Sequence, residues 1–254
     1  MTNLQSAFQK LVDIMYELRD KCPWDQQQTK ESLRYLTLEE CYELSDAILE
    51  NNYEGLKEEL GDILLHVIFY SVIGDEKKQF NLIDVINAQS KKLIDRHPHI
   101  YSDVKVKNVK DVKRNWELLK LKENKKTSIL SGVPNSIPAM LKSYRVQEKV
   151  KGVGFDYPNR KKSFEKIIEE IHEFNAELEA NNMEQATEEL GDVLFSIIGY
   201  AQNIGINPID GLEKTNKKFI KRFQEMENLM AKEKKQIAQY SSEELDVFWN
   251  QVKD

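Results

Sequence analysis

An internal repeat limits the possible folds of this chain more than any other feature of its sequence. The segment EECYELSDAILENNYEGLKEELGDILLHVIFY (residues 39–70) aligns without a gap to EEIHEFNAELEANNMEQATEELGDVLFSIIGY (residues 169–200). The offset between equivalent positions is constant, so Glu40 corresponds to Glu170 and Asp62 to Asp192. A repeat of this length predicts two copies of one structural unit in tandem.

The similarity continues on both sides of this segment, with small shifts in register. The further matching pairs are CPWD (22–25) with VGFD (153–156), SKKLIDR (90–96) with NKKFIKR (216–222), and NWELLK (115–120) with FWNQVK (248–253). Residues 123–138 lie between the copies and contain one glycine and two prolines, which is typical of a linker. We place the boundary near Thr127, which gives an N-terminal unit of residues 1–126 and a C-terminal unit of residues 127–254.

Each unit is expected to be entirely helical. Apolar residues recur at helical spacing, 40% of the chain is hydrophobic, and Gly and Pro number only 10 and 6. The stretch HIYSDVKVKN (99–108) alternates but is short and polar, so it predicts a loop or a minor hairpin. We expect an opening helix, a loop with an aromatic-Asp pair, two helices joined by an Asn-Asn turn, a basic helix and a closing Trp-containing helix. So few helices cannot enclose a core, which predicts packing against another unit or subunit.

Charge and cysteine content limit the partners and the compartment. The formal net charge of -6 disfavours non-specific binding to nucleic acid or to an anionic membrane. No secretory signal and no apolar run of membrane-spanning length is visible, and Cys22 and Cys41 show neither metal-ligand nor disulfide spacing. We therefore expect a cytoplasmic protein with free thiols.

Four carboxylates in each unit are the candidate chemistry. Residues three apart share a helix face, so Glu40 projects with Glu43, and Glu59 with Asp62. Two adjacent antiparallel helices would bring all four together, although helix carboxylates more often face solvent. Because residues 63–73 are apolar around most of the helix, we expect a buried helix with Asp62 pointing inward.

Buried carboxylates need compensation. Each costs roughly several kcal/mol unless it is protonated or bound to metal. An all-oxygen ligand set suits Mg²⁺, with Mn²⁺ as a second possibility. Gly61 and Gly191 also lie within these helices, where glycine costs about 1 kcal/mol relative to alanine. Their presence indicates close approach of another backbone or a ligand.

The motif E-E-x-x-E, a spacer and E-x-x-D, together with CPWD and ELGD, resembles the MazG family of nucleoside triphosphate pyrophosphohydrolases. The resemblance covers nearly the whole chain in a two-unit arrangement. It implies an all-α homodimer with four-helix-bundle active sites, which hydrolyses NTPs or dNTPs with Mg²⁺ to monophosphates and pyrophosphate and so cleans the nucleotide pool. By this resemblance the metal ligands are Glu170, Glu173, Glu189 and Asp192 in the second unit and Glu40, Glu43, Glu59 and Asp62 in the first.

Further candidates lie beside the metal ligands. Lys218 and Arg222 share a helix face and suit a polyphosphate tail, with a solvated basic face as the alternative. Asn216 belongs to the same nucleotide-binding set, and Trp249 either stacks on a base or packs in the core. Glu169 either orients the attacking water as a catalytic residue or is a plain surface residue.

The two units differ in their basic helices. Ser90 stands where the second unit has Asn216, and Pro98 ends the first basic helix early. We therefore expect the second unit to be the more active one. His97 and His99, beside Pro98, are expected to be loop residues.

Two other classes of protein remain open at this point. A di-iron carboxylate bundle requires Glu-x-x-His on two helices, and only Glu169 with His172 supplies one, because Tyr42 replaces the histidine in the first unit. A non-catalytic helical interaction protein would leave the carboxylates unexplained. Neither the preferred base nor the sugar can be read from the sequence.

Overall fold

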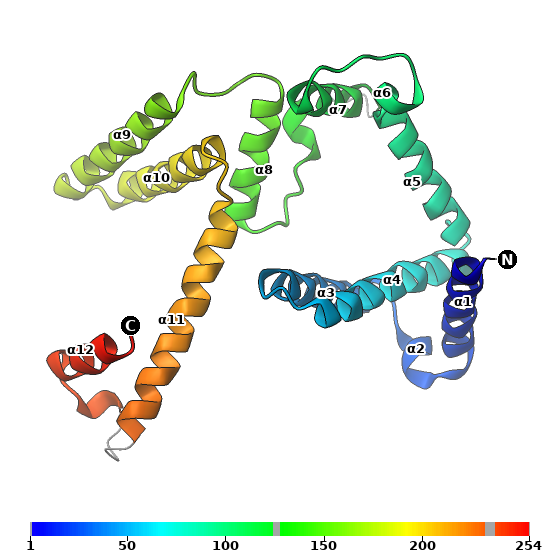
Figure 1. Cartoon of the computed structure of the whole chain (residues 1–254), viewed down its shortest axis with the longest axis horizontal. Coiled ribbons are helices and arrows are strands. Elements are labelled where there is room, and N and C mark those ends of the chain that lie inside the picture. The colour runs from blue at the N-terminus through cyan, green and yellow to red at the C-terminus, as the bar shows by residue number, and fades with distance from the viewer. Residues whose placement is uncertain (1, 124–127, 232–236, 254) are drawn as a thin grey trace. The chain divides into compact units, whose positions relative to one another are not determined.

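The computed structural model describes residues 2–123, 128–231 and 237–253, and these residues form helices without any strand (Figure 1). The expected all-α fold is confirmed. In chain order the helices are α1 (Asn3–Lys21), α2 (Pro23–Gln27), α3 (Lys30–Leu49), α4 (Tyr53–Glu76), α5 (Leu82–Arg96), α6 (Pro98–Tyr101), α7 (Val109–Glu123), the 3-10 helix η1 (Ile129–Gly132), α8 (Ala139–Gly152), α9 (Arg160–Glu179), α10 (Met183–Asn203), α11 (Pro208–Met230), the 3-10 helix η3 (Ile237–Gln239) and α12 (Ser242–Gln251).

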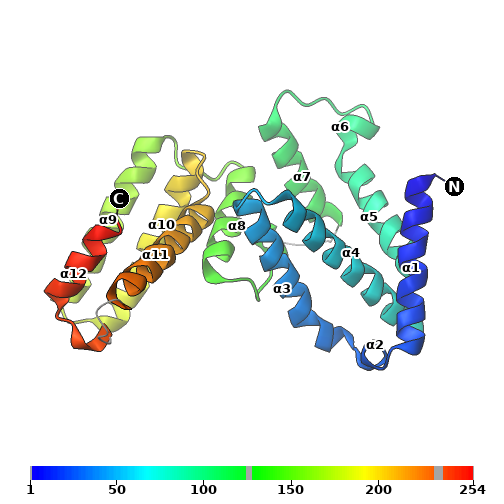
Figure 2. The same cartoon turned by 60° about the horizontal axis from the view of Figure 1, so that its bottom comes forward.

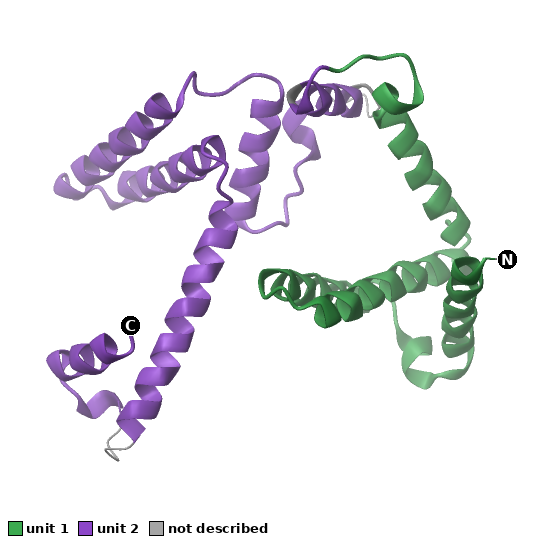
Figure 3. Ribbon diagram, viewed as in Figure 1, with its two compact units in different colours: residues 1–106 green, residues 107–254 purple. Residues whose placement is uncertain are grey.

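The chain forms two compact units, residues 1–106 and residues 107–254 (Figure 3). Helix α7 belongs to the second unit, where it packs against α8 and η1. The sequence motif NWELLK assigns the same helix to the first repeat. The structural division therefore falls before α7, whereas the boundary near Thr127 stays a prediction about the repeats, and residues 124–127 lie outside the described part.

Each unit is built on a helical hairpin, α3–α4 in the first and α9–α10 in the second, and the paired helices lie side by side in both views (Figures 1 and 2). The expected Asn-Asn turn joins them in both units. Asn51 and Asn181 adopt positive φ values of 53° and 56°, a conformation that asparagine tolerates better than most residues. Side-chain caps begin α3 and α9, where Thr29 and Asn159 accept from backbone N–H groups of the first turn.

The opening helices pack differently in the two units. Met15 of α1 is fully buried with Leu33 and Phe69 in the core of the first unit. In the second unit Gln147 of α8 is buried, and its amide donates to the Phe195 carbonyl at 2.8 Å. Gly199, which corresponds to Phe69, provides the space for that amide, since a Cβ there would collide with Gln147. One position of the repeat thus holds an apolar core contact in one unit and a polar contact in the other.

The aromatic-Asp motif was expected to be a loop, and in the first unit that expectation is wrong. Pro23 starts the short helix α2, since proline is tolerated in a first helical turn. Arg19 at the end of α1 donates to the carbonyls of Asp25 and Gln28 and pairs with Glu76 at 2.7 Å. Arg19 therefore connects α1 both to the motif and to the far end of α4.

The basic helices differ as the sequence predicted. Helix α5 ends at Arg96, and Pro98 opens the separate four-residue helix α6, so α5 has 15 residues where α11 has 23. Residues 99–101 of the stretch that was expected to be a loop or minor hairpin belong to α6, so the expectation of a loop is wrong for His99. Residues 102–108 form neither helix nor strand. Helix α11 instead continues to Met230 and packs its end against α12 around Met226, Met230 and Tyr240.

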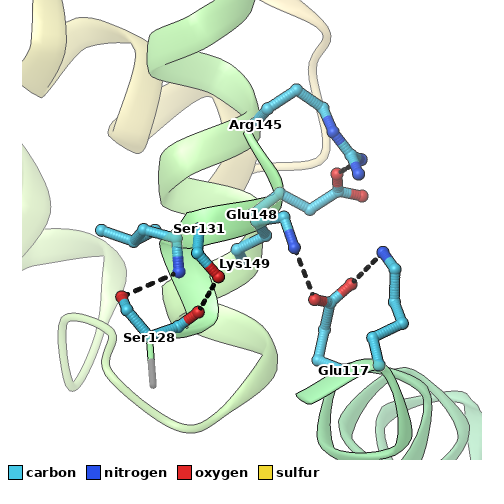
Figure 4. Close-up of polar contacts among 8 residues, drawn as sticks. Glu117, Ser128, Ser131, Arg145, Glu148 and Lys149 are labelled. Atoms are coloured by element: carbon cyan, nitrogen blue, oxygen red, sulfur yellow. Dashed lines mark hydrogen bonds and ion pairs between the residues drawn. The ribbon is translucent and has the colours of Figure 1, made fainter. Parts of the chain in front are cut away.

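A buried ion pair attaches α7 to α8 (Figure 4). The carboxylate of Glu117 accepts from Lys149 Nζ at 2.7 Å and from Lys120 Nζ at 3.2 Å. Burial raises the pKa of Glu117, but hydrogen bonds from Lys149 and Lys120 outweigh it and leave this pKa below its usual value. Beside this pair Arg145 and Glu148 of α8 contact each other, and Ser128 accepts from the backbone N–H of Leu130.

Candidate functional site

Each hairpin gathers three glutamates where its two helices face each other. In the first unit one carboxylate oxygen from each of Glu40, Glu43 and Glu59 lies within 4.8 Å of the others. In the second unit Glu170, Glu173 and Glu189 meet the same limit. The glutamates converge because two of them lie three residues apart on the first helix of the hairpin, and the short Asn-Asn turn places the second helix alongside. The predicted meeting of four carboxylates is thus observed for the three glutamates of each unit.

The two aspartates of the motif lie one turn further along α4 and α10. Asp62 and Asp192 follow Glu59 and Glu189 by three residues and fall outside the closest sets of oxygens. Their charges nevertheless reach the clusters. The pKa of Glu40 is raised by burial and then by Asp62, and that of Glu189 is raised by burial and then by Asp192. Both aspartates therefore add to the negative potential at the glutamates, although they lie outside the sets whose oxygens meet within 4.8 Å.

The electrostatics of both clusters favour a divalent cation. Burial followed by the charge of Glu43 raises the pKa of Glu59, and a hydrogen bond with Glu170 followed by burial raises that of Glu173. Like charges held this close destabilise the ionised form of each group. A hard divalent cation removes that repulsion, and the donor atoms are all carboxylate oxygens. The residues present thus fit Mg²⁺ or Mn²⁺.

The expectation of a buried site is wrong for the single chain. Only Glu170 is buried, whereas Glu43, Glu173 and Asp192 are exposed and Asp62 is half-buried. The helix after Asp62 is covered on one side only, because Leu64 and Val67 are 38% and 40% exposed. Gly61 and Gly191 have open space where a Cβ would stand, so the close approach that we expected is not made within the described chain.

Lys166 on α9 is a functional candidate that sequence reasoning missed. Its Nζ lies 2.7 Å from Oε1 of Glu170 and 2.6 Å from Oε1 of Glu169. Hydrogen bonds to Glu169 and then to Glu170 raise the pKa of Lys166, so the ammonium stays charged. Its position four residues before Glu170 was the available signal, since that spacing favours an ion pair on a helix. Glu169, the candidate catalytic residue, is thus paired with Lys166 at the edge of the cluster.

The candidate nucleotide-binding residues lie on α11 and α12. Arg222 donates to the Lys253 carbonyl at 2.5 Å, Asn216 donates to Glu213 at 3.3 Å, and Lys218 is exposed. The ring of Trp249 lies 5.0 Å from that of Phe219 and packs against the Met226–Met230–Tyr240 cluster, as in the core alternative. The far end of α11 runs well away from the α9–α10 hairpin (Figure 1). Among the described residues, no hydrogen bond or ion pair joins Asn216, Lys218 or Arg222 to either carboxylate cluster.

Comparison with known proteins decides the family. The sequence pattern of the MazG nucleotide pyrophosphohydrolase domain matches residues 28–101 and 159–226, which contain both carboxylate clusters. The chain belongs to the MazG family. The MazG-family match occurs twice, once in each copy of the repeat, and each match spans one hairpin and the basic helix that follows it.

Relatives of this MazG-family chain are similar over nearly its full length. The nucleoside triphosphate pyrophosphohydrolase/pyrophosphatase MazG of Thermotoga maritima is 39% identical over 250 residues, which cover 97% of this chain and 95% of that protein. The nucleoside triphosphate pyrophosphohydrolase of Escherichia coli K12 is 36% identical over 252 residues, or 96% of each chain. The Bacillus subtilis protein YabN is 39% identical over 99% of this chain, which spans only 52% of YabN.

Beyond the MazG motif, the first unit has a buried histidine that sequence reasoning did not single out. Nδ1 of His66 lies 2.8 Å from Oγ1 of Thr37, which lies 2.8 Å from the Tyr70 hydroxyl. Burial lowers the pKa of His66, against the charge of Asp62. The second unit has Ser196 and Ile167 at the positions of His66 and Thr37.

No metal-holding group among the described residues contains a histidine, and His172 is exposed. The di-iron alternative therefore finds no support in the geometry of this MazG-family chain.

Within the described part, no helix is both long enough and apolar enough to cross a membrane.

A half-open cavity of about 870 Å³ lies elsewhere in the second unit, between α7, α8 and the end of α10. Its lining includes Trp116, Tyr144 and Gln202. From Glu189 to Gln202 helix α10 runs for thirteen residues, about 20 Å. The acidic side chains of this cavity are paired with its lysines and arginine, so its chemistry does not match that of the MazG carboxylate motif.

Proposed function

We propose that this chain is a Mg²⁺-dependent nucleoside triphosphate pyrophosphohydrolase that converts NTPs and dNTPs to monophosphates and pyrophosphate. The observation that carries the proposal is the pair of carboxylate clusters, one in each MazG-matched region, whose mutual repulsion calls for a divalent cation. The names of the Thermotoga maritima and Escherichia coli relatives describe the same reaction.

The metal ligands of the second unit are Glu170, Glu173, Glu189 and Asp192 in this proposal, with Glu40, Glu43, Glu59 and Asp62 as their counterparts in the first. Bound Mg²⁺, or Mn²⁺ in its place, supplies charge neutralisation to the polyphosphate and acidity to a water molecule. The carboxylates hold and orient the ion, and Glu169 at the edge of the cluster directs the attacking water toward the α-phosphate.

The basic helix holds the substrate. Lys218 and Arg222 lie four residues apart on α11, so both side chains extend from one face toward the β- and γ-phosphates. Asn216, two residues before Lys218, completes the set with its amide. Trp249 is half-buried beside Phe219 and offers its remaining surface to the base. Because Arg222 donates to the Lys253 carbonyl and no described contact joins these groups to the carboxylates, we infer that a second chain completes the site.

The proposed assembly is therefore a homodimer that packs two hairpins into a four-helix arrangement. Support comes from apolar residues that are exposed at equivalent positions of both repeats, Leu60, Leu64 and Val67 in the first and Leu190, Leu194 and Ile197 in the second. Two uncovered apolar stripes of one pattern suit an isologous contact. Covering them would also remove the carboxylates from bulk water.

Light scattering on the purified chain tests the assembly. We expect a dimer at micromolar concentration and a shift toward monomer for Leu64→Glu, which places a charge in the stripe. Leu4→Glu is the matched control, because Leu4 is also exposed but lies on α1, outside the hairpin. A fully active monomer would contradict this part of the proposal.

The reaction products test the activity. With Mg²⁺ and an NTP we expect a nucleoside monophosphate and pyrophosphate, separable by ion-exchange chromatography from a nucleoside diphosphate and orthophosphate. The second pair of products would reject the assignment. A turnover screen over NTPs, dNTPs and damaged nucleotides identifies the substrate for the proposed cytoplasmic role in cleaning the nucleotide pool.

Ligand variants test the division of labour between the units. Glu173→Ala and Asp192→Ala should remove most turnover, whereas Glu43→Ala and Asp62→Ala should spare more of it. The physical reason is the longer basic helix of the second unit, 23 residues against 15. Steady-state rates, with helicity checked by circular dichroism, decide between the units, and equal losses from both pairs would mean that the units work alike.

A further inference from the structure

One difference between the two carboxylate clusters is a positively charged side chain. Lys166 contacts Glu170 and Glu169 in the second unit, at 2.7 Å and 2.6 Å. The equivalent residue of the first unit is Leu36, because α3 and α9 align without a gap from their first residue to their last. The second cluster thus contains a cation that belongs to the chain itself, whereas no ion pair to Glu40, Glu43 or Glu59 is made by the described residues.

The environment of Lys166 makes this contact more than a surface ion pair. The Glu170 side chain is only 8% exposed, while that of Lys166 is 31% exposed. Lys166 therefore neutralises the most buried carboxylate of the cluster and still has open space beside it. A divalent cation that binds Glu170 competes with the ammonium for the same oxygen, and it repels the ammonium once it is bound.

A displaced ammonium needs a new partner near the cluster. The lysine stem has four carbons and three rotatable donors at its end, so Nζ can swing several ångströms without movement of α9. The groups that enter with the metal are the phosphates of the substrate, which carry the opposite charge.

On the basis of the proposed function, we propose that Lys166 is a positioning residue of the second site. Without metal, Lys166 holds Glu170 and Glu169 in place. When metal binds, the Lys166 ammonium leaves these carboxylates and pairs with the polyphosphate of the substrate. It acts as a counter-ion that the metal replaces. The second site then binds metal more weakly on its own and binds metal with nucleotide more cooperatively than the first site, where Leu36 cannot take part.

The test is a metal titration that requires no turnover. Mn²⁺ binding is followed by electron paramagnetic resonance in the Glu59→Gln background, which removes a ligand of the first site. Lys166→Met keeps the length of the side chain and removes its charge, and we expect it to bind Mn²⁺ about tenfold more tightly. The reciprocal control is Leu36→Lys in the Glu189→Gln background, which should weaken Mn²⁺ binding at the first site.

The second measurement distinguishes a lysine that contacts the nucleotide from one that only repels the metal ion. With Mn²⁺ at saturation, a non-hydrolysable NTP analogue should bind Lys166→Met about tenfold more weakly, and Lys166→Arg should restore most of the loss because it keeps the positive charge. Circular dichroism checks the fold of each variant, and Lys166→Gln replaces Lys166→Met if the latter is unstable.

Opposite effects on the metal and on the nucleotide would support the proposal. Unchanged or weaker Mn²⁺ binding in Lys166→Met would overturn it, and so would unchanged nucleotide binding. Failure of the proposed function would be a different result, namely that the unsubstituted chain hydrolyses no NTP. The Mn²⁺ titration measures the effect of Lys166 on metal affinity and does not depend on hydrolysis.

Discussion

Replacing Glu117 by alanine should destabilise the second unit more than any exposed charge substitution. The Lys149 and Glu117 side chains are only 5% and 12% exposed, and 2.7 Å separates Nζ from the carboxylate. Removing one partner of a buried ion pair costs about 3–5 kcal/mol, because the other charge remains buried without compensation. We expect the lower end, about 3 kcal/mol, since water reaches part of the Glu117 side chain.

In a unit of this size 1 kcal/mol lowers the melting temperature by about 2–4 °C, so Glu117→Ala should lower it by about 6–12 °C. Differential scanning calorimetry on the full chain measures the shift. The control is Glu225→Ala, which removes an exposed partner of Lys221 at 3.9 Å, with the two side chains 78% and 48% exposed, and should change stability by less than about 0.5 kcal/mol.

A double replacement distinguishes lost pairing from lost packing. Glu117→Met together with Lys149→Met fills similar space without charge, and such exchanges are often neutral or stabilising. We expect the double variant to recover most of the stability that Glu117→Ala loses. The reasoning is refuted if Glu117→Ala shifts the transition as little as Glu225→Ala does.

The remaining predictions concern pH, a buried hydrogen-bond chain and metal binding. The pKa of Glu117 is lower in the folded chain than in the unfolded one, so its contribution is present above the unfolded value of about 4.3 and disappears as the pH falls through the folded value. Acid titration should therefore narrow the stability gap between the unsubstituted chain and Glu117→Gln. Thr37→Val should cost about 1–3 kcal/mol in urea unfolding, because it leaves His66 and Tyr70 without their shared partner. Added Mg²⁺ should raise the melting temperature of the unsubstituted chain, and the rise should shrink in Glu170→Gln, which loses a ligand; an equal rise in both would contradict the assigned site.

The sequence determined the features that depend on neighbouring residues along the chain. Helical spacing placed Glu40 with Glu43 and Glu170 with Glu173, and the gapless repeat showed that both copies share one hairpin. Pro98 ended α5 as expected, because proline cannot donate the hydrogen bond that would continue the helix. These rules act within one or two helical turns, so no knowledge of the fold is needed.

Only the tertiary structure decided which surfaces are covered. The apolar pattern after Asp62 indicated a fully buried helix, yet one side of α4 is open in the single chain. Trp249 packs beside Phe219, and the partner of Glu117 is Lys149, far from it in sequence, which draws α7 into the second unit. The carboxylates likewise meet on one hairpin while Arg222 lies on a helix that leaves it. Burial depends on what another element places over a residue, and hydrophobic periodicity reports that a face needs covering without specifying what covers it.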